Sequence, residues 1–292
     1  MSAFALKALA CLFMLTDHIG AVFYMLMPVW LRWIGRIAFP IFVWFIAEGC
    51  ARTRNIHRYL FRLGVFALLS EIPFDAAFNL SRFGRLDLDF LALTNVFYTM
   101  FLGVLAISVY AGISTRRRPT LALLPFLLLI PLLFRPPDEA ALAFCALYAV
   151  SAYSLSRLMT EVGETTAEKS TEESFIRRGA ALAATVPVIA LGDLLETDYG
   201  SFGVAFIVLM YLAGSRRAKL AILSAGIFLE YGLPLLSEPR FAVLMMFGAA
   251  MLAVPLLSFY NGRRGPEIKW AFYAFYPVHL AVLALIFIFI AG

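Results

Sequence analysis

The sequence predicts an all-α protein, a polytopic transmembrane bundle of about 10–11 helices. Hydrophobic residues make up 62% of the 292 residues and charged residues only 15%, and the mean hydropathy is +0.87. Soluble domains are about 45–50% apolar and about 25% charged. Apolar stretches of membrane-spanning length recur along the chain. Since no linker or low-complexity segment separates two folded parts, we predict a single domain over residues 1–292.

Charge, proline or glycine bounds each apolar stretch, which fixes where the predicted spans begin and end. Several stretches are shorter than the about 20 residues of a full span, so one or two are expected to be tilted, broken or joined. In chain order, the predicted spans are residues 4–26, 30–48, 60–80, 90–113, 120–134, 140–159, 179–196, 200–214, 218–236, 241–259 and 270–290.

The distribution of basic residues predicts the orientation in the membrane. With the N-terminus in the cytoplasm, eighteen of the 24 Lys and Arg residues fall on the cytoplasmic side. The first span contains ionisable residues and no small-x-small cleavage site follows it, so we expect it to be retained rather than removed as a signal peptide. The sequence therefore predicts a multi-pass protein with a cytoplasmic N-terminus.

Asp17 and His18 lie inside the first span, where an ionisable side chain costs several kcal/mol unless it faces protein or a water-filled cavity. At about 1.5 Å per residue, His18 lies about 16 Å from Lys7 along its helix, and His279 lies about 15 Å from Lys269. Glu230 lies about 16 Å from Lys219 by the same count. These side chains are therefore expected at one depth, as parts of an intramembrane site.

Arg36 lies in the second span, and Glu71 and Asp75 share one face of the third. Two interpretations stay open: a structural network of ion pairs with Arg32 that neutralises buried charge, or direct involvement with a substrate. Pro73 removes a backbone hydrogen bond between the two acids, and we expect a kink there. Pro40 and Pro277 are expected to open space near the midplane in the same way.

His18 has two interpretations as well, a core histidine with a satisfied hydrogen bond or a general base. Adjacent helical residues point about 100° apart, so Asp17 is expected to bind Arg36 or another helix rather than orient His18. The second histidine expected at the same depth, His279, favours the interpretation of His18 as a general base. The unperturbed pKa of histidine, about 6.5, suits proton transfer near neutral pH. A metal site is the rival, but no metal-ligand spacing is present, and we predict no metal.

Two basic loops flank the helices with buried polar residues. Arg52, Arg54 and Arg58 follow the second span, and Asn261, Arg263 and Arg264 precede the last. One interpretation is topology, since cytoplasmic loops are basic; the other is a phosphate site built from guanidinium forks and backbone N–H groups. The basic residues lie on short membrane-flanking loops, which does not favour nucleic acid as a partner.

The sequence resembles the TraX family of polytopic membrane proteins, named for the pilin N-acetyltransferase of conjugative plasmids, and more distantly the acyltransferase-3 type of membrane acyltransferase. The blocks that carry the resemblance are Leu6-Lys7 through Asp17-His18-Ile19-Gly20; Leu31-Arg32-Trp33-Ile34-Gly35-Arg36 through Phe42 with Glu48-Gly49; Thr53-Arg54-Asn55 through Leu63 with Ser70-Glu71-Ile72-Pro73-Phe74-Asp75; and Tyr260-Asn261-Gly262-Arg263-Arg264-Gly265 with Phe272 through Pro277-Val278-His279-Leu280.

The resemblance implies transfer of an acetyl group from cytoplasmic acetyl-CoA to an amine or hydroxyl, in the bacterial cytoplasmic (inner) membrane. The acceptor stays open: a protein N-terminus, a glycan or a lipid. His18 would be the base, His279 would orient the thioester or carry a second proton, and Arg36 or Asn95 would stabilise the oxyanion. The alternative is a proton-coupled transporter, for which buried His, Asp, Glu and Arg are also expected. Thermal stabilisation by CoA would distinguish the two, because a transporter of unrelated solutes should not be stabilised by CoA.

Overall fold

The computed structural model describes residues 1–83, 95–114, 171–237, 239–266 and 268–291. Within these ranges every regular element is helical and there is no strand. Among the described residues, seven helical segments are long and apolar enough to cross a membrane: Ala3–Val22, Trp30–Arg52, Ile56–Phe83, Val96–Ser114, Arg216–Ser237, Phe241–Ser258 and Trp270–Ile290. The all-α polytopic prediction is confirmed, and the chain is a multi-pass membrane protein.

The boundaries predicted for these seven helices agree to within a few residues, apart from the beginning of the 90–113 span. The span predicted at 179–196 is divided instead between two helices, Thr171–Ala183 and Val186–Leu194. The span predicted at 200–214 corresponds to the shorter helix Gly200–Leu212. The spans predicted at 120–134 and 140–159 lie outside the described residues, and so does the first part of 90–113. The total of about 10–11 helices and the cytoplasmic N-terminus therefore stay predictions.

The chain divides into two compact units whose segments alternate along the sequence. The first unit comprises Met1–Ala51, Leu68–Asp89 and Leu209–Gly292, and the second comprises Arg52–Ala67 and Phe90–Val208. Neither unit is a continuous piece of chain. The prediction of one domain over residues 1–292 stays a prediction.

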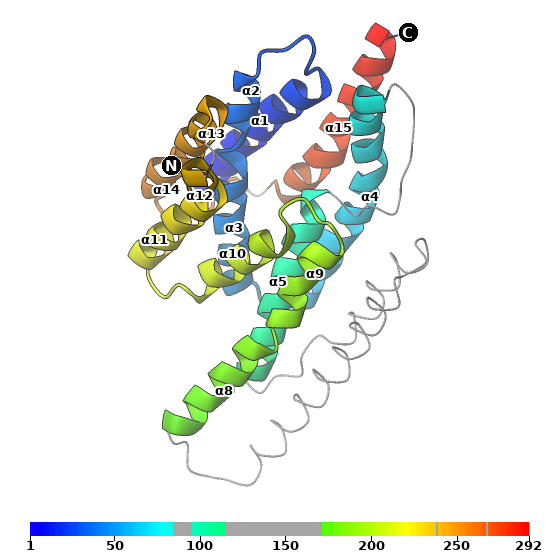
Figure 1. Ribbon diagram of the computed structural model, residues 1–292. Coiled ribbons are helices and arrows are strands. Elements are labelled where there is room, and N and C mark those ends of the chain that lie inside the picture. The colour runs from blue at the N-terminus through cyan, green and yellow to red at the C-terminus, as the bar shows by residue number, and fades with distance from the viewer. Residues whose placement is uncertain (84–94, 115–170, 238, 267, 292) are drawn as a thin grey trace. The chain divides into compact units, whose positions relative to one another are not determined.

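In the first unit, α1 (Ala3–Val22) lies beside α2 (Trp30–Gly35) and α15 (Lys269–Ala291), as Figure 1 shows. The first turn of α1 is fully capped. The Ser2 side chain accepts a hydrogen bond from the N–H of Ala5, and the N–H groups of Ala3 and Phe4 donate to the carbonyls of Arg263 and Arg264 at 2.8 and 3.0 Å. Backbone groups that a helix leaves unpaired at its N-terminus are thus satisfied by the loop before α15.

The span predicted at 30–48 is broken into two helices. α2 ends at Gly35 and α3 (Ala38–Arg52) begins two residues beyond Arg36, with single i→i−3 hydrogen bonds from Arg36 and Ile37 between them. Pro40 lies in the first turn of α3, where proline fits best because it lacks the N–H that an interior helical residue donates, and this agrees with the position of the break. By contrast, α4 (Ile56–Phe83) and α15 continue through Pro73 and Pro277.

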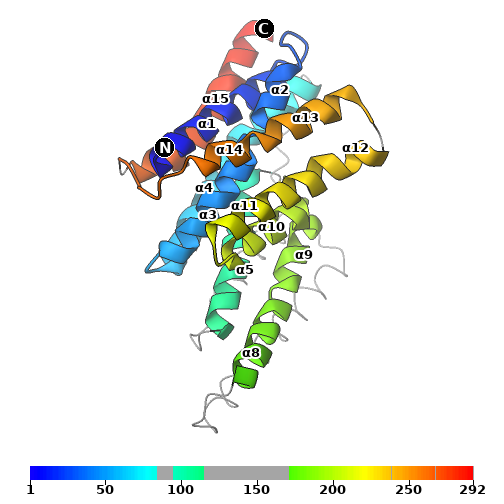
Figure 2. The same cartoon turned by 90° about the vertical axis from the view of Figure 1, so that its left-hand side faces the viewer.

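The rest of the first unit is a pair of broken helices, seen best in Figure 2. One runs through α11 (Arg216–Ile227), the π-helical turn η2 (Phe228–Gly232) and α12 (Leu233–Ser237). The other consists of α13 (Phe241–Met251), which contacts α2, and α14 (Ala253–Ser258). The wide turn precedes Pro234, which cannot donate to the carbonyl of Glu230.

In the second unit, α5 (Val96–Ser114) packs against α8 (Thr171–Ala183) and α9 (Val186–Leu194) and is buried on nearly every side. Gly103 permits close contact with α10 (Gly200–Leu212), because a Cβ there would lie 2.7 Å from Ile207. Asn95 caps α5 through its oxygen and donates its amide to the carbonyl of Ala67 at 2.9 Å. These contacts give Asn95 a structural role; its suggested oxyanion role stays a prediction.

Candidate functional site

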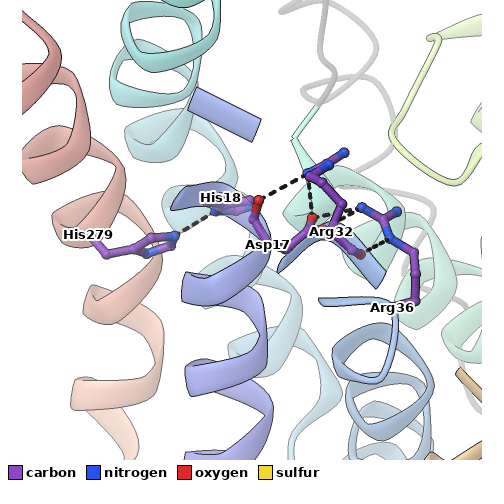
Figure 3. Close-up of polar contacts among 5 residues, drawn as sticks. All are labelled: Asp17, His18, Arg32, Arg36 and His279. Carbon is purple, nitrogen blue, oxygen red and sulfur yellow. Dashed lines mark hydrogen bonds and ion pairs between the residues drawn. The ribbon is translucent and has the colours of Figure 1, made fainter. Parts of the chain in front are cut away.

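Two histidines from opposite ends of the chain meet in the first unit. His18 Nδ1 on α1 lies 2.7 Å from His279 Nε2 on α15, as Figure 3 shows. The side chains are 9% and 7% exposed, whereas Val278, the residue before His279, is 58% exposed. The common depth predicted from the sequence is therefore matched by direct contact, and both rings face the protein interior rather than lipid.

Aromatic rings surround the pair. Phe78 of α4 and Tyr276 of α15 stand edge-on to His18, with ring centroids 5.6 and 5.8 Å away. Phe275 stacks on His279, and its backbone carbonyl lies 2.7 Å from His279 Nδ1. Among the described residues, no carboxylate is hydrogen-bonded to either imidazole. The histidine pair is thus set in an apolar and aromatic environment.

Asp17 points away from its neighbour and joins α1 to α2 (Figure 3). Arg36 Nη2 donates to both carboxylate oxygens at 2.7 and 2.8 Å, and Arg32 Nη1 donates to Oδ2 at 2.8 Å and to the Asp17 carbonyl at 3.2 Å. The two arginines are also linked, since Arg36 Nε donates to the carbonyl of Arg32. The expectation that Asp17 binds Arg36 instead of orienting His18 is confirmed.

Two glycines let the helices of this cluster approach closely. A Cβ at Gly35 would lie 2.2 Å from the Cβ of Asp17, and one at Gly20 would lie 2.9 Å from the Cβ of Leu31. Contacts this short leave no room for a side chain, so both positions require glycine for packing. The sequence alone does not identify Gly35 as a contact of Asp17, although its place one residue before Arg36 could have suggested it.

The remaining acids of the predicted network occupy two further elements. Glu71 and Asp75 on α4 are buried, at 3% and 5% exposure, and their pairing with Arg36 stays a prediction. Glu230, in the π-helical turn η2, interacts electrostatically with Arg36. Within the described residues, no group of three or more His, Cys, Asp or Glu side chains could hold a metal ion.

The two predicted phosphate loops belong to different units. Arg52, Arg54 and Arg58 lie at the end of α3 and the start of α4, in the second unit, and all three are exposed. Asn261, Arg263 and Arg264, exposed in the loop between α14 and α15, belong to the first. A phosphate site that uses both loops stays a prediction.

The loop of the first unit has a defined backbone. Gly262 and Gly265 adopt φ of +76° and +75°, which favours glycine, and Asn261 Oδ1 accepts from the N–H of Arg263 at 3.0 Å. Tyr260 at its start donates to the Glu48 carboxylate at 2.9 Å. The loop carbonyls cap α1, as described above, and the guanidinium groups of Arg263 and Arg264 are left at the surface.

The family model described as "TraX protein" matches residues 2–159 and 161–287. A probable fimbrial assembly protein FimC, serogroup H1, of Dichelobacter nodosus is 28% identical over 298 residues, which cover 97% of this chain and 94% of that protein. No solved structure matches.

Proposed function

This chain belongs to the TraX family, and from that premise we propose that it is an acetyltransferase of the bacterial inner membrane that uses cytoplasmic acetyl-CoA. The observation that supports the proposal most directly is the buried contact between His18 and His279, 2.7 Å apart and without a carboxylate partner in the described part of the chain. An uncharged imidazole inside a protein can accept a proton from an attacking nucleophile.

The reaction needs one proton acceptor and no further reactant. The acceptor amine or hydroxyl attacks the thioester carbonyl of acetyl-CoA and gives its proton to His18. The carbon–sulfur bond then breaks, the new amide or ester bond is complete, and the proton leaves with CoA as its thiol. A placed base of this kind contributes about 10² to 10⁴-fold to the rate.

The basic loop between α14 and α15 is the proposed site for the phosphates of acetyl-CoA. Arg263 and Arg264 are exposed at the end of α1 that is remote from His18, and guanidinium groups bind phosphates through paired N–H donors. Arg52, Arg54 and Arg58 belong to the second unit, and their part in phosphate binding stays a prediction from the sequence. Acetyl-CoA binding would therefore begin at the capped end of α1, with the acetyl group directed along the helix toward His18.

Arg36 was one predicted stabiliser of the oxyanion. Because its Nη2 donates to both oxygens of Asp17, the geometry favours the structural interpretation of this cluster, in which Arg32 and Arg36 neutralise Asp17 and hold α2 against α1.

The acceptor is proposed from the comparisons. The Dichelobacter nodosus relative is named as a probable fimbrial assembly protein, and the family is named for an enzyme that acetylates the N-terminus of pilin. We therefore propose the amino group of a pilus subunit as the first acceptor to test, with a glycan or a lipid as the others.

The experiment is acetyl transfer by the purified protein in detergent and in liposomes. Radiolabelled acetyl-CoA would be supplied with a pilin-like peptide that has a free N-terminus, and the same peptide with a blocked N-terminus would be the control. We expect label in the first peptide only. Label in neither peptide, with no rise in the unfolding temperature on adding CoA, would contradict the proposal and favour the transporter alternative, since a bound ligand stabilises the folded protein by mass action.

A further inference from the structure

The contact between the two histidines is an in-plane hydrogen bond. The ring planes differ by 10° and the centroids are 4.9 Å apart, while the facing nitrogens are 2.7 Å apart. Rings stacked face to face could not bring two nitrogens this close. The imidazoles therefore lie edge to edge in nearly one plane, with one proton between His18 Nδ1 and His279 Nε2.

The carbonyl of Phe275 determines which nitrogens carry protons. A carbonyl oxygen only accepts, so His279 Nδ1, 2.7 Å from it, must be the N–H donor. His279 is buried against the Phe275 ring, and no carboxylate of the described residues is hydrogen-bonded to it, so this environment disfavours a charged ring. A neutral imidazole has one N–H, so His279 Nε2 carries a lone pair and accepts. His18 Nδ1 must then donate, and the remaining nitrogen of His18, Nε2, carries a lone pair without a proton.

The hydrogen bonds of the two rings give His18 and His279 different roles. Both nitrogens of His279 are in use, one by Phe275 and the other by His18. His18 Nε2 has no hydrogen bond to any described residue. Asp17, the carboxylate next in sequence, is occupied by Arg32 and Arg36 and cannot orient the ring. Of the two rings, His18 is the one with a basic nitrogen that no described residue hydrogen-bonds, so this nitrogen can receive a proton from a substrate.

We propose that His18 Nε2 is the general base of the acetyl transfer and that His279 is a positioning residue, which fixes the tautomer of His18 through the relay from Phe275 O to His279 to His18. The assignment of a base rests on the proposed function; the tautomers do not. When His18 Nε2 takes the acceptor's proton, the His18 ring becomes positively charged. The proton on His18 Nδ1 can then move to His279 Nε2, so the two rings share this charge. The charge is removed when Nε2 gives its proton to CoA, which leaves as its thiol.

The first test is nitrogen NMR of the protein labelled with ¹⁵N-histidine, purified in detergent without any substrate. The chain has 3 histidines, and a His57→Gln background leaves only the two of interest. We expect both rings to be neutral Nδ1–H tautomers near neutral pH. In His279→Leu, we expect His18 to become a mixture of its Nδ1–H and Nε2–H tautomers. A His18 ring protonated at Nε2 with a bare Nδ1 would overturn the proposal even if the enzyme transferred acetyl groups.

The second test compares two substitutions of His279 in the transfer assay. His279→Leu removes the acceptor for His18 Nδ1–H, whereas the amide oxygen of His279→Gln can still accept from it. We expect kcat to fall by about 10²-fold in His279→Leu with the KM for acetyl-CoA unchanged, and His279→Gln to recover about a tenth or more of the wild-type kcat. Equal kcat values in both variants would show that the relay does not orient the base.

The two tests separate the failure of this inference from the failure of the proposed function. If the wild-type protein transfers no acetyl group but shows the expected tautomers, the relay is retained and the acetyltransferase proposal fails. If it transfers acetyl groups and His279→Leu keeps the wild-type kcat, the function is retained and the role of His279 is refuted.

Discussion

Asp17 and His18 are neighbours on α1, and the two regions they enter differ in almost every physical respect. Asp17 meets two guanidinium groups toward α2, in a cluster where Arg32 is 33% exposed and the carboxylate 14%. His18 meets one uncharged imidazole of α15 among aromatic rings. A helix turns about 100° per residue, so adjacent residues can serve separate contacts.

The difference teaches which region holds the fold and which is available for chemistry. Each oxygen of Asp17 is bonded to an arginine, and Gly35 is packed against its side chain. His18 keeps one nitrogen with no hydrogen bond to the described residues. Polar groups that are fully paired stabilise a structure, whereas a buried group with an open position can bind or react. Substitutions in the two regions should therefore separate stability from activity.

The largest effect should follow His18→Ala. We expect acetyl transfer by the folded protein to fall by about 10² to 10⁴-fold. The unfolding temperature in detergent should also fall, because the buried ring and its contacts with Phe78 and Tyr276 are lost. His57→Ala, at an exposed histidine, is the matched control and should keep the wild-type rate. Near wild-type transfer by purified His18→Ala would show that His18 is not the base.

Asp17→Ala should act mainly on stability. Removing the carboxylate leaves two partly buried guanidinium groups without their shared partner. We expect the free energy of unfolding to fall by about 2–3 kcal/mol, which is less than for a fully buried pair because solvent partly screens Arg32. Asp17→Asn should lose less, since its amide oxygen still accepts a hydrogen bond. Thermal unfolding of both variants measures these losses of stability. An unchanged unfolding temperature for Asp17→Ala would show that the cluster does not stabilise the fold.

Gly35→Ala tests the packing of the same cluster without changing a charge. The new methyl group would lie 2.2 Å from the Cβ of Asp17, and overpacking of this kind costs about 1–3 kcal/mol. Gly248→Ala on α13 is the matched control, because a Cβ there meets nothing within 4 Å. We expect the control to be neutral or slightly stabilising, so equal unfolding temperatures for the two variants would contradict the close approach of α1 and α2.

The smallest effect should come from Arg32→Gln. Arg32 is 33% exposed and contacts one carboxylate oxygen, whereas Arg36 is 17% exposed and contacts both. We expect Arg32→Gln to cost about 1 kcal/mol or less and Arg36→Gln to cost more, measured by the same unfolding assay. A larger loss in Arg32→Gln would reverse our ranking of the two ion pairs.

Several features of this site could be predicted from the sequence. Hydropathy placed the membrane-spanning helices, and counting residues from the basic ends placed His18 and His279 at one depth. The angle between adjacent helical residues directed Asp17 away from His18. These predictions needed only local information, because the rise and turn of a helix are the same in every protein.

Other features needed the folded chain. The contact of Gly35 with Asp17 depends on the distance between two helices, which no local pattern contains. The two phosphate loops, which the sequence joined in one site, belong to different units. The acids of α4 are buried as predicted, but sequence spacing alone does not identify their partners.

The sequence by itself determined that this is a multi-pass helical protein of the membrane with ionisable side chains inside its spans, because hydropathy along a helix is a local property. Only the tertiary structure decided that His18 Nδ1 faces His279 Nε2 across 261 positions of sequence, and that a backbone carbonyl holds the far side of the second ring. Hydrogen bonds fix tautomers through distances between atoms, and no pattern along the chain contains those distances.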